Sequence, residues 1–140
     1  MITQDAVKKL AVKHQTSEFN VAREYCQHLF LSYLYRAKES EKVLFKGGTA
    51  LKIIYGSPRF SEDLDFSGFR VFSSSIEQLV EDTLLEIERE GIKADVQEST
   101  KTSGGYLAII NLSFLGYSVN VQLEISLRRR NAIKGAAVLV

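Results

Sequence analysis

The sequence predicts an α+β protein whose helices pack on a mixed, mainly antiparallel sheet of about five strands. Apolar residues repeat at helical spacing before residue 40 and again over 75–90, which predicts amphipathic helices. Residues 118–127 alternate apolar and polar side chains without a break, as expected of a strand with one buried face. Glycine-containing turns separate this segment from two further strand-like segments, a pattern typical of an antiparallel meander.

The composition is that of a globular protein. The chain has 140 residues, of which 45% are hydrophobic and 25% charged, so it can bury a core. A net charge of +1 gives no overall attraction to nucleic acid. Cys26 is the only cysteine, which excludes an internal disulfide and favours a cytoplasmic location. No apolar run approaches the roughly 20 residues of a membrane-spanning helix, so we expect no membrane association.

Residues 1–42 are predicted to form an N-terminal helical segment. A short helix is expected over 5–15 and a longer one over 18–38, with Thr16–Ser17 supplying the N-cap of the second. Cys26 lies on the wide apolar and aromatic stripe of the longer helix. We therefore interpret it as an inert buried thiol rather than a nucleophile.

The most informative stretch is 45–67, with the sequence FKGGTALKIIYGSPRFSEDLDFS. A predicted strand over 43–46 ends at two glycines, and a short helix follows until a third glycine and the only proline stop it. A second strand is predicted over 63–67. Asp63 and Asp65 are two apart on that strand, so they share a face and lie about 6–7 Å apart.

These parts suit phosphate chemistry. The pair Gly47 and Gly48, placed before a helix that begins at Thr49, lets backbone N–H groups approach a phosphate. Two carboxylates on one strand face can hold Mg²⁺ (or Mn²⁺) beside those phosphates, an arrangement used in phosphoryl and nucleotidyl transfer. The alternative interpretation is a turn-bordered helix followed by a solvated acidic strand.

Three polar residues near these glycines and aspartates each allow two interpretations. Lys46 either contacts a phosphate or is the last exposed residue of its strand. Arg59 and Ser61 contact the nucleotide or orient the carboxylates, or else they are turn residues that cap the loop.

The next predicted element is a helix over 75–90. Ser75 and Gln78 match a capping box at its start, and Gly91 is expected to end it. Its outer face is strongly acidic, which indicates either solvation or a docking face for a basic partner.

Strands are then predicted over 92–98, 106–114 and 118–127. A loop or hairpin turn is expected over 101–105 and a tight turn at Gly116.

Glu124 is an acid on the polar face of the last strand, between the core-facing Leu123 and Ile125. It is either part of a site or an exposed cross-strand partner of a lysine or arginine. The three arginines at 128–130 could bind a triphosphate or an RNA backbone, or form a solvated strand end.

The strings GGTALKIIYG and RFSEDLDF resemble the AbiEii-type toxins of abortive-infection and toxin–antitoxin systems, within the nucleotidyltransferase superfamily. The resemblance is strong over 46–67 and thinner to about residue 130. It implies a nucleotidyltransferase-like core and transfer of a nucleoside monophosphate from an NTP to a tRNA or protein acceptor. It also implies a cognate antitoxin as partner.

The resemblance also implies roles for particular residues. It places a third carboxylate on a strand next to the Asp-x-Asp strand, and Glu124 stands there in place of the commoner Asp. If these strands are neighbours, their polar faces coincide and the three acids form one cluster. The implied catalytic and metal-binding residues are Asp63, Asp65 and Glu124. The implied nucleotide-binding residues are Lys46, Gly47, Gly48, Thr49, Arg59 and Ser61.

We therefore expect a nucleotidyltransferase-like core over 43–130, with 131–140 as the start of a C-terminal region that is cut short. An alternative is a nucleotide-binding module or fragment that is catalytically inactive and acts through partner binding. A third hypothesis is a structural partner that acts through the acidic helix over 75–90 and binds no nucleotide.

Overall fold

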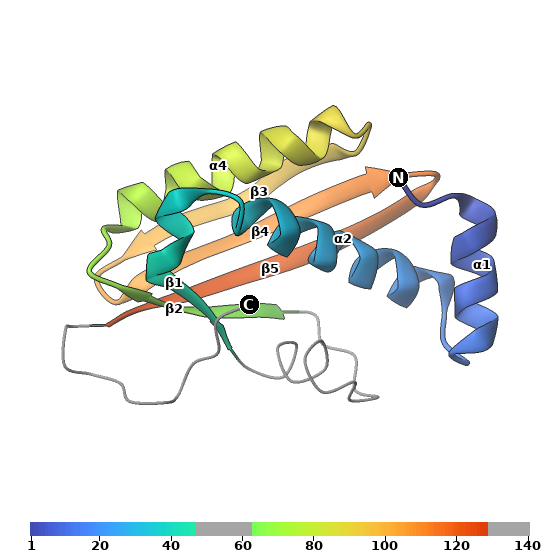
Figure 1. Cartoon of the computed structure of the whole chain (residues 1–140), viewed down its shortest axis with the longest axis horizontal. Helices are drawn as coiled ribbons and strands as arrows, with labels where there is room; N and C mark the ends of the chain where they lie inside the picture. The colour runs from blue at the N-terminus through green and yellow to red at the C-terminus, as the bar shows by residue number, and fades with distance from the viewer. Residues whose placement is uncertain (47–62, 129–140) are drawn as a thin grey trace.

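The computed structural model describes residues 1–46 and 63–128, and it has the predicted α+β architecture. Within these residues one sheet has the strand order β1-β2-β5-β4-β3 (Figure 1). All neighbouring strands are antiparallel except β2 and β5, which are parallel, so the sheet is mixed and mainly antiparallel. The elements are α1 (Gln4–Lys13), α2 (Glu18–Leu34), the 3₁₀ helix η1 (Lys38–Lys42), β1 (Val43–Lys46), β2 (Asp63–Phe69), α4 (Ser73–Arg89), β3 (Lys93–Thr102), β4 (Gly105–Phe114) and β5 (Tyr117–Arg128).

The two N-terminal helices begin at side-chain caps. The Thr3 hydroxyl accepts a hydrogen bond from the Ala6 N–H, and the Ser17 hydroxyl accepts one from the Asn20 N–H, as predicted for the second helix. Both helices end earlier than expected. α2 stops at Leu34, four residues before the predicted end at 38, because the chain turns there into η1.

Helices α2 and α4 cover one face of the sheet, whereas α1 lies beyond its end (Figure 1). The sequence predicted that all three helices would pack on the sheet face, and for α1 this is wrong. Its buried residues Val7 and Ala11 instead form a small separate cluster with Val21 of α2. The apolar stripe of α1 is short, and α2 covers it together with Tyr117 at the start of β5.

Helix α4 starts two residues before the predicted capping box. The backbone N–H of Ser75 donates to the Phe72 carbonyl (3.0 Å), so the first turn has formed before Ser75 is reached. No side chain caps the helix, and the Gln78 amide donates instead to Asp82 (2.9 Å). The predicted capping box is therefore wrong. The predicted end is confirmed, since Gly91 has a positive φ of 93°.

The β3–β4 and β4–β5 connections are tight hairpins. Leu115 and Gly116 both have positive φ (52° and 83°), the geometry of a two-residue turn that matches strand twist. Strand β3 continues to Thr102, which pairs with Gly105, so the turn is shorter than the loop predicted over 101–105. Pairing with β4 extends β3 through polar residues that carry no alternating signal.

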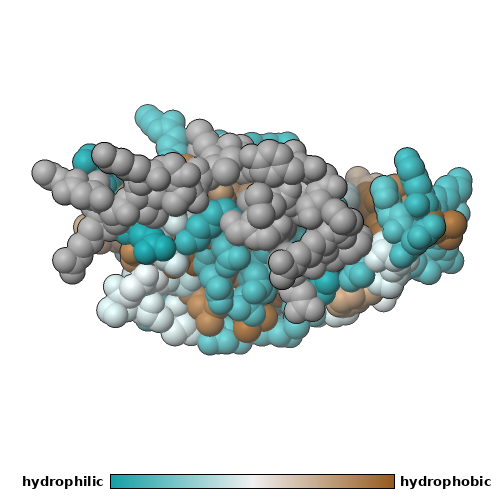
Figure 2. All heavy atoms as spheres, turned by 90° about the horizontal axis from the view of Figure 1, so that it is seen from below, coloured by the Kyte–Doolittle hydropathy of each residue, from teal (hydrophilic) through white to brown (hydrophobic). Residues whose placement is uncertain are grey.

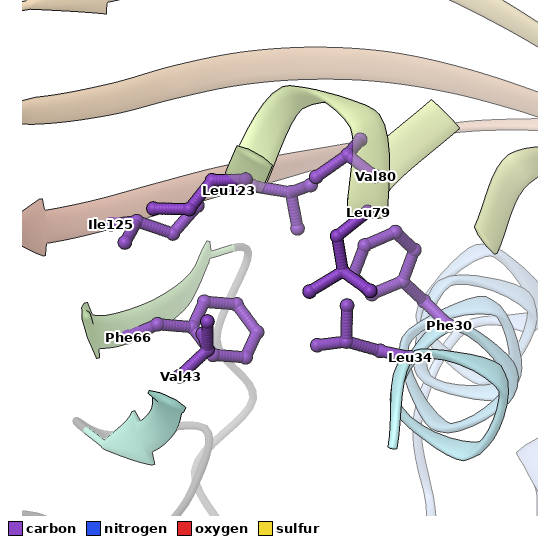
Figure 3. Close-up of a pocket in the computed structure, with 9 residues that line it drawn as sticks. Phe30, Leu34, Val43, Phe66, Leu79, Val80, Leu123 and Ile125 are labelled. Atoms are coloured by element: carbon purple, nitrogen blue, oxygen red, sulfur yellow. The ribbon is translucent and has the colours of Figure 1, made fainter. Parts of the chain in front are cut away.

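The core lies between the sheet and helices α2 and α4. Cys26 is fully buried there, which confirms its predicted burial, and burial raises the pKa of its thiol to about 12, which disfavours the nucleophilic thiolate. The core also contains a small void of about 10 Å³ that is lined entirely by apolar side chains (Figure 3). Its lining residues are Phe30, Leu34, Val43, Phe66, Ile76, Leu79, Val80, Leu123 and Ile125.

Seen from below, the described surface is largely hydrophilic, with separate small apolar patches (Figure 2). In the described part of the chain, no helix combines the length and the hydrophobicity needed to cross a membrane.

Candidate functional site

Burial of alternate residues fixes which way the central strands face. In β2, Leu64 and Phe66 are 0% and 1% exposed and belong to the core. The residues between them, Asp63 and Asp65, therefore point to the other side of the sheet, which we call the open face. In β5, Leu123 is likewise buried, and Glu124 points to the open face as predicted.

The register of the sheet brings the acids together. Asp65 pairs with Glu124 across the parallel β2–β5 ladder, and Asp63 pairs with Gln122. Directly opposed residues on neighbouring strands share a face, and the strands lie about 4.8 Å apart. Glu124 is thus beside Asp65, on the same side of the sheet as both aspartates. We call Asp63, Asp65 and Glu124 the acidic face.

Lys46 of β1 lies next to Asp65 on the other side of β2 from Glu124. It is the last residue of β1, it is half-buried, and it pairs with Asp65 across the antiparallel β1–β2 ladder. Asp65 therefore lies between a cation on β1 and the Glu124 carboxylate on β5. On the far side of Glu124, the next strand contributes Leu107.

The surroundings of Asp65 favour its protonated form. Partial burial raises the pKa of the Asp65 carboxyl, and the negative charge of Glu124 raises it further. A hydrogen bond with the Glu124 carboxyl and the charge of Asp63 act in the same direction, whereas Lys46 lowers the pKa. Among the described residues, these influences together leave the pKa of the Asp65 carboxyl above its ordinary value.

One participant was not predicted from the sequence. The Gln122 side-chain amide donates a hydrogen bond to Oε1 of Glu124, with Nε2 and Oε1 3.0 Å apart. The strand alternation already placed Gln122 on the polar face two residues before Glu124. That signal marks a shared face, but only the side-chain conformation shows that the two groups are bonded.

The donor set fits a hard divalent cation. Mg²⁺ takes one or two protein carboxylates and completes its shell with water and substrate phosphates, and the adjacent Asp65 and Glu124 supply such a pair. Within residues 1–46 and 63–128, no group of three or more His, Cys, Asp and Glu side chains is arranged to hold a metal ion. The assignment of all three carboxylates as ligands of one ion therefore stays a prediction.

The remaining predicted site residues lie outside the described residues. They are Gly47, Gly48, Thr49, Arg59 and Ser61. The predicted short helix over 49–55 also lies there, as do Arg129 and Arg130. Arg128, the last residue of β5, pairs with Phe69 at the end of the parallel ladder.

The fold, with two adjacent acid-bearing strands in its centre, defines a nucleotidyltransferase-like domain. A sequence model of the family described as "Nucleotidyl transferase AbiEii toxin, Type IV TA system" matches residues 29–134. The match spans well over half of the chain, and the chain belongs to this family of nucleotidyltransferase toxins of toxin–antitoxin systems.

Solved structures show the same fold. JHP933 from Helicobacter pylori superposes with a TM-score of 0.56 at 21% identity, over 85% of this chain and 47% of that protein. A candidate nucleotidyltransferase from the same organism gives a TM-score of 0.57 at 20% identity, over 89% of this chain and 55% of that protein. The chain thus spans about half the length of these two proteins. No curated protein sequence matches it.

Proposed function

We propose that this protein transfers a nucleoside monophosphate from an NTP to an acceptor and releases pyrophosphate. The observation that carries the proposal is the register of β2 and β5, which sets Glu124 beside Asp65 on the face that also carries Asp63. Membership of the AbiEii family supports the same reaction class. We further propose a tRNA or a protein as the acceptor, a cytoplasmic location, and a role as the toxin paired with a cognate antitoxin.

In the proposed reaction, the acceptor oxygen attacks the α-phosphorus of the NTP, and the bond from that phosphorus to the pyrophosphate oxygen breaks. Asp63 and Asp65 would hold Mg²⁺ or Mn²⁺, with Glu124 completing the site or taking the proton from the acceptor. Such an ion polarises the phosphoryl oxygens and neutralises charge that develops on the leaving group. Gly47, Gly48 and Thr49 would hold the triphosphate.

The flanking polar residues have supporting roles in this proposal. Lys46 is adjacent to Asp65 in the register, so its ammonium group can balance either the carboxylate or a phosphate oxygen bound beside it. Arg59 and Ser61 would contact the nucleotide from the segment that leads into β2.

The direct test is to incubate the protein with Mg²⁺ and each of the four ribonucleoside triphosphates, labelled on the α-phosphate, with and without total tRNA. We expect pyrophosphate release and transfer of label to tRNA or to protein. Asp65→Asn serves as the matched inactive control. Pyrophosphate release that Asp65→Asn leaves unchanged would contradict the assignment.

A second candidate function is nucleotide binding without turnover. The observation in its favour is that the chain spans only 47% and 55% of the two solved structures, so catalytic parts could lie in the remainder of such proteins. Saturable NTP binding without pyrophosphate release, with or without tRNA, would support this candidate over the enzyme.

A further inference from the structure

The contact between Gln122 and Glu124 has a role beyond packing. We propose that Gln122 is a positioning residue of the acidic face, which holds the Glu124 carboxylate toward Asp65 and the bound cation. This inference rests on the proposed function and extends it to a residue that acts through Glu124 without touching the reacting atoms.

Two pairs of side chains on neighbouring strands lie directly opposite each other. β2 contributes Asp63 and Asp65, β5 contributes Gln122 and Glu124, and the parallel register opposes Asp63 with Gln122 and Asp65 with Glu124. Three members of this group of four are acids. Gln122 is the neutral member, and its amide carries N–H donors, which ionised carboxylates lack.

The hydrogen bond acts on the side chain that most needs orientation. The Glu124 side chain is exposed on the open face, and it has one more rotatable bond than an aspartate. Its donor on Nε2 of Gln122 lies 3.0 Å from Oε1. Because this contact fixes one carboxylate oxygen, the other is directed consistently for metal binding or proton transfer.

The strand itself holds Gln122 in place. Its neighbours Val121 and Leu123 are 1% and 0% exposed, so the backbone on both sides of Gln122 is anchored in the core. β5 is also paired on both edges, with β2 and with β4. The amide therefore projects from one of the best-supported positions of the described sheet, as a residue that orients another requires.

A matched control exists on the same strand. Asn120 lies two residues before Gln122 on the open face, and its side-chain oxygen accepts a hydrogen bond from Asn111 of β4 (2.9 Å). Asn120→Met likewise replaces a side-chain amide by an apolar side chain, but the contact that it removes is with β4 and not with the acidic face. Gln122→Asn keeps the amide and shortens its reach, so it tests the contact even if the methionine variant misfolds.

The experiment is a double-mutant cycle with two measurements. Mn²⁺ binding is measured by electron paramagnetic resonance on the wild type, Gln122→Met, Glu124→Ala and the double variant, and turnover with NTP is measured on the same proteins. We expect Gln122→Met and Gln122→Asn to weaken Mn²⁺ binding and to lower kcat about tenfold, the usual effect of losing a group that orients a metal ligand. KM for NTP should stay within about twofold, and Asn120→Met should resemble the wild type.

The cycle separates positioning from a merely structural role. If Gln122 acts through Glu124, then Gln122→Met should cause no further loss in the Glu124→Ala background. Additive losses in the double variant would overturn this inference. So would a Gln122→Met variant that binds Mn²⁺ and turns over NTP as well as an active wild type. Either result would leave the proposed function intact. A wild type that neither binds Mn²⁺ nor releases pyrophosphate would instead overturn the proposed function, and the positioning role with it.

Discussion

Acidic residues have different surroundings on the central strands of the sheet and on its edge strand β3. Strands β2 and β5 are paired on both sides, and the residues next to their acids, Leu64, Phe66, Leu123 and Ile125, are buried. In the described part of the chain β3 pairs only with β4, and every side chain of β3 except Ala94 is exposed. Asp95 and Glu98 of β3 are therefore surface acids, whereas Asp65 and Glu124 are held against each other. The acids of the candidate site thus lie on strands whose adjacent residues are buried in the core.

The sharpest way to break this comparison is to neutralise one acid in each region. We expect Asp65→Asn to lower metal-dependent turnover by about a hundredfold or more, the usual scale of losing a group that acts on the transition state. Asp95→Asn on β3 should leave turnover unchanged. The measurement is pyrophosphate release with saturating NTP, together with circular dichroism to show that both variants fold.

The second comparison pairs Glu124 with Glu98. Glu124→Gln keeps the shape and removes the charge, so we expect turnover to fall roughly 10–100-fold while KM for NTP changes little. Glu98→Gln is the edge-strand control and should behave as the wild type. A rise in KM without a fall in kcat would show that Glu124 contributes to substrate binding alone.

Stability should follow the same division. Phe66 follows Asp65 in β2, is 1% exposed and packs against Phe45 in a tilted arrangement with ring centroids 5.4 Å apart. Phe66→Ala should cost about 3–5 kcal/mol in the free energy of unfolding. Val96→Ala on β3, where the side chain is 47% exposed, should change it by less than about 0.5 kcal/mol. Urea unfolding of both variants measures the difference, and equal costs would contradict the comparison.

The buried thiol of Cys26 in α2 should make the stability of the protein depend on pH. Its folded-state pKa of about 12 lies above the ordinary value of 9.0, so the neutral thiol stabilises the fold below pH 9. That contribution is lost as the pH rises from 9 through 12. Cys26→Ala should be less stable at neutral pH by about 1–2 kcal/mol but should lose less stability on alkaline titration. Parallel slopes for the two proteins above pH 9 would show that the thiol does not titrate on unfolding.

The smallest expected effect concerns the void beneath the central strands. Val43 is 2% exposed and lines it, so Val43→Ile adds one methylene to unoccupied space (Figure 3). We expect a gain of up to about 1 kcal/mol in the free energy of unfolding if the added group fits, as cavity filling often gives. Thermal unfolding measures it, and a fall in melting temperature would show that the site cannot accept the added volume.

Local patterns were enough to predict much of the fold. The alternation over 118–127 identified β5 and the face of Glu124, because a strand with one buried face admits only one register of apolar residues. The caps and glycines located the start of α2, the end of α4 and the β4–β5 turn for the same reason: each is a short-range hydrogen-bonding or φ requirement. The Asp-x-Asp spacing placed Asp63 and Asp65 on one face, because side chains two apart on a strand point the same way.

The sequence by itself thus determined which residues face which way within each element. Only the tertiary structure decided which elements are neighbours: β2 and β5 are far apart in the chain, yet they pair in parallel, and their apolar residues join one core with those of α2 and α4. That register sets Asp65 beside Glu124, and the side-chain conformation of Gln122 lets its amide donate a hydrogen bond to Glu124. The tertiary structure also decided that α1 packs on α2 and that polar β3 continues to Thr102. Both follow from contacts with other elements rather than from local propensity.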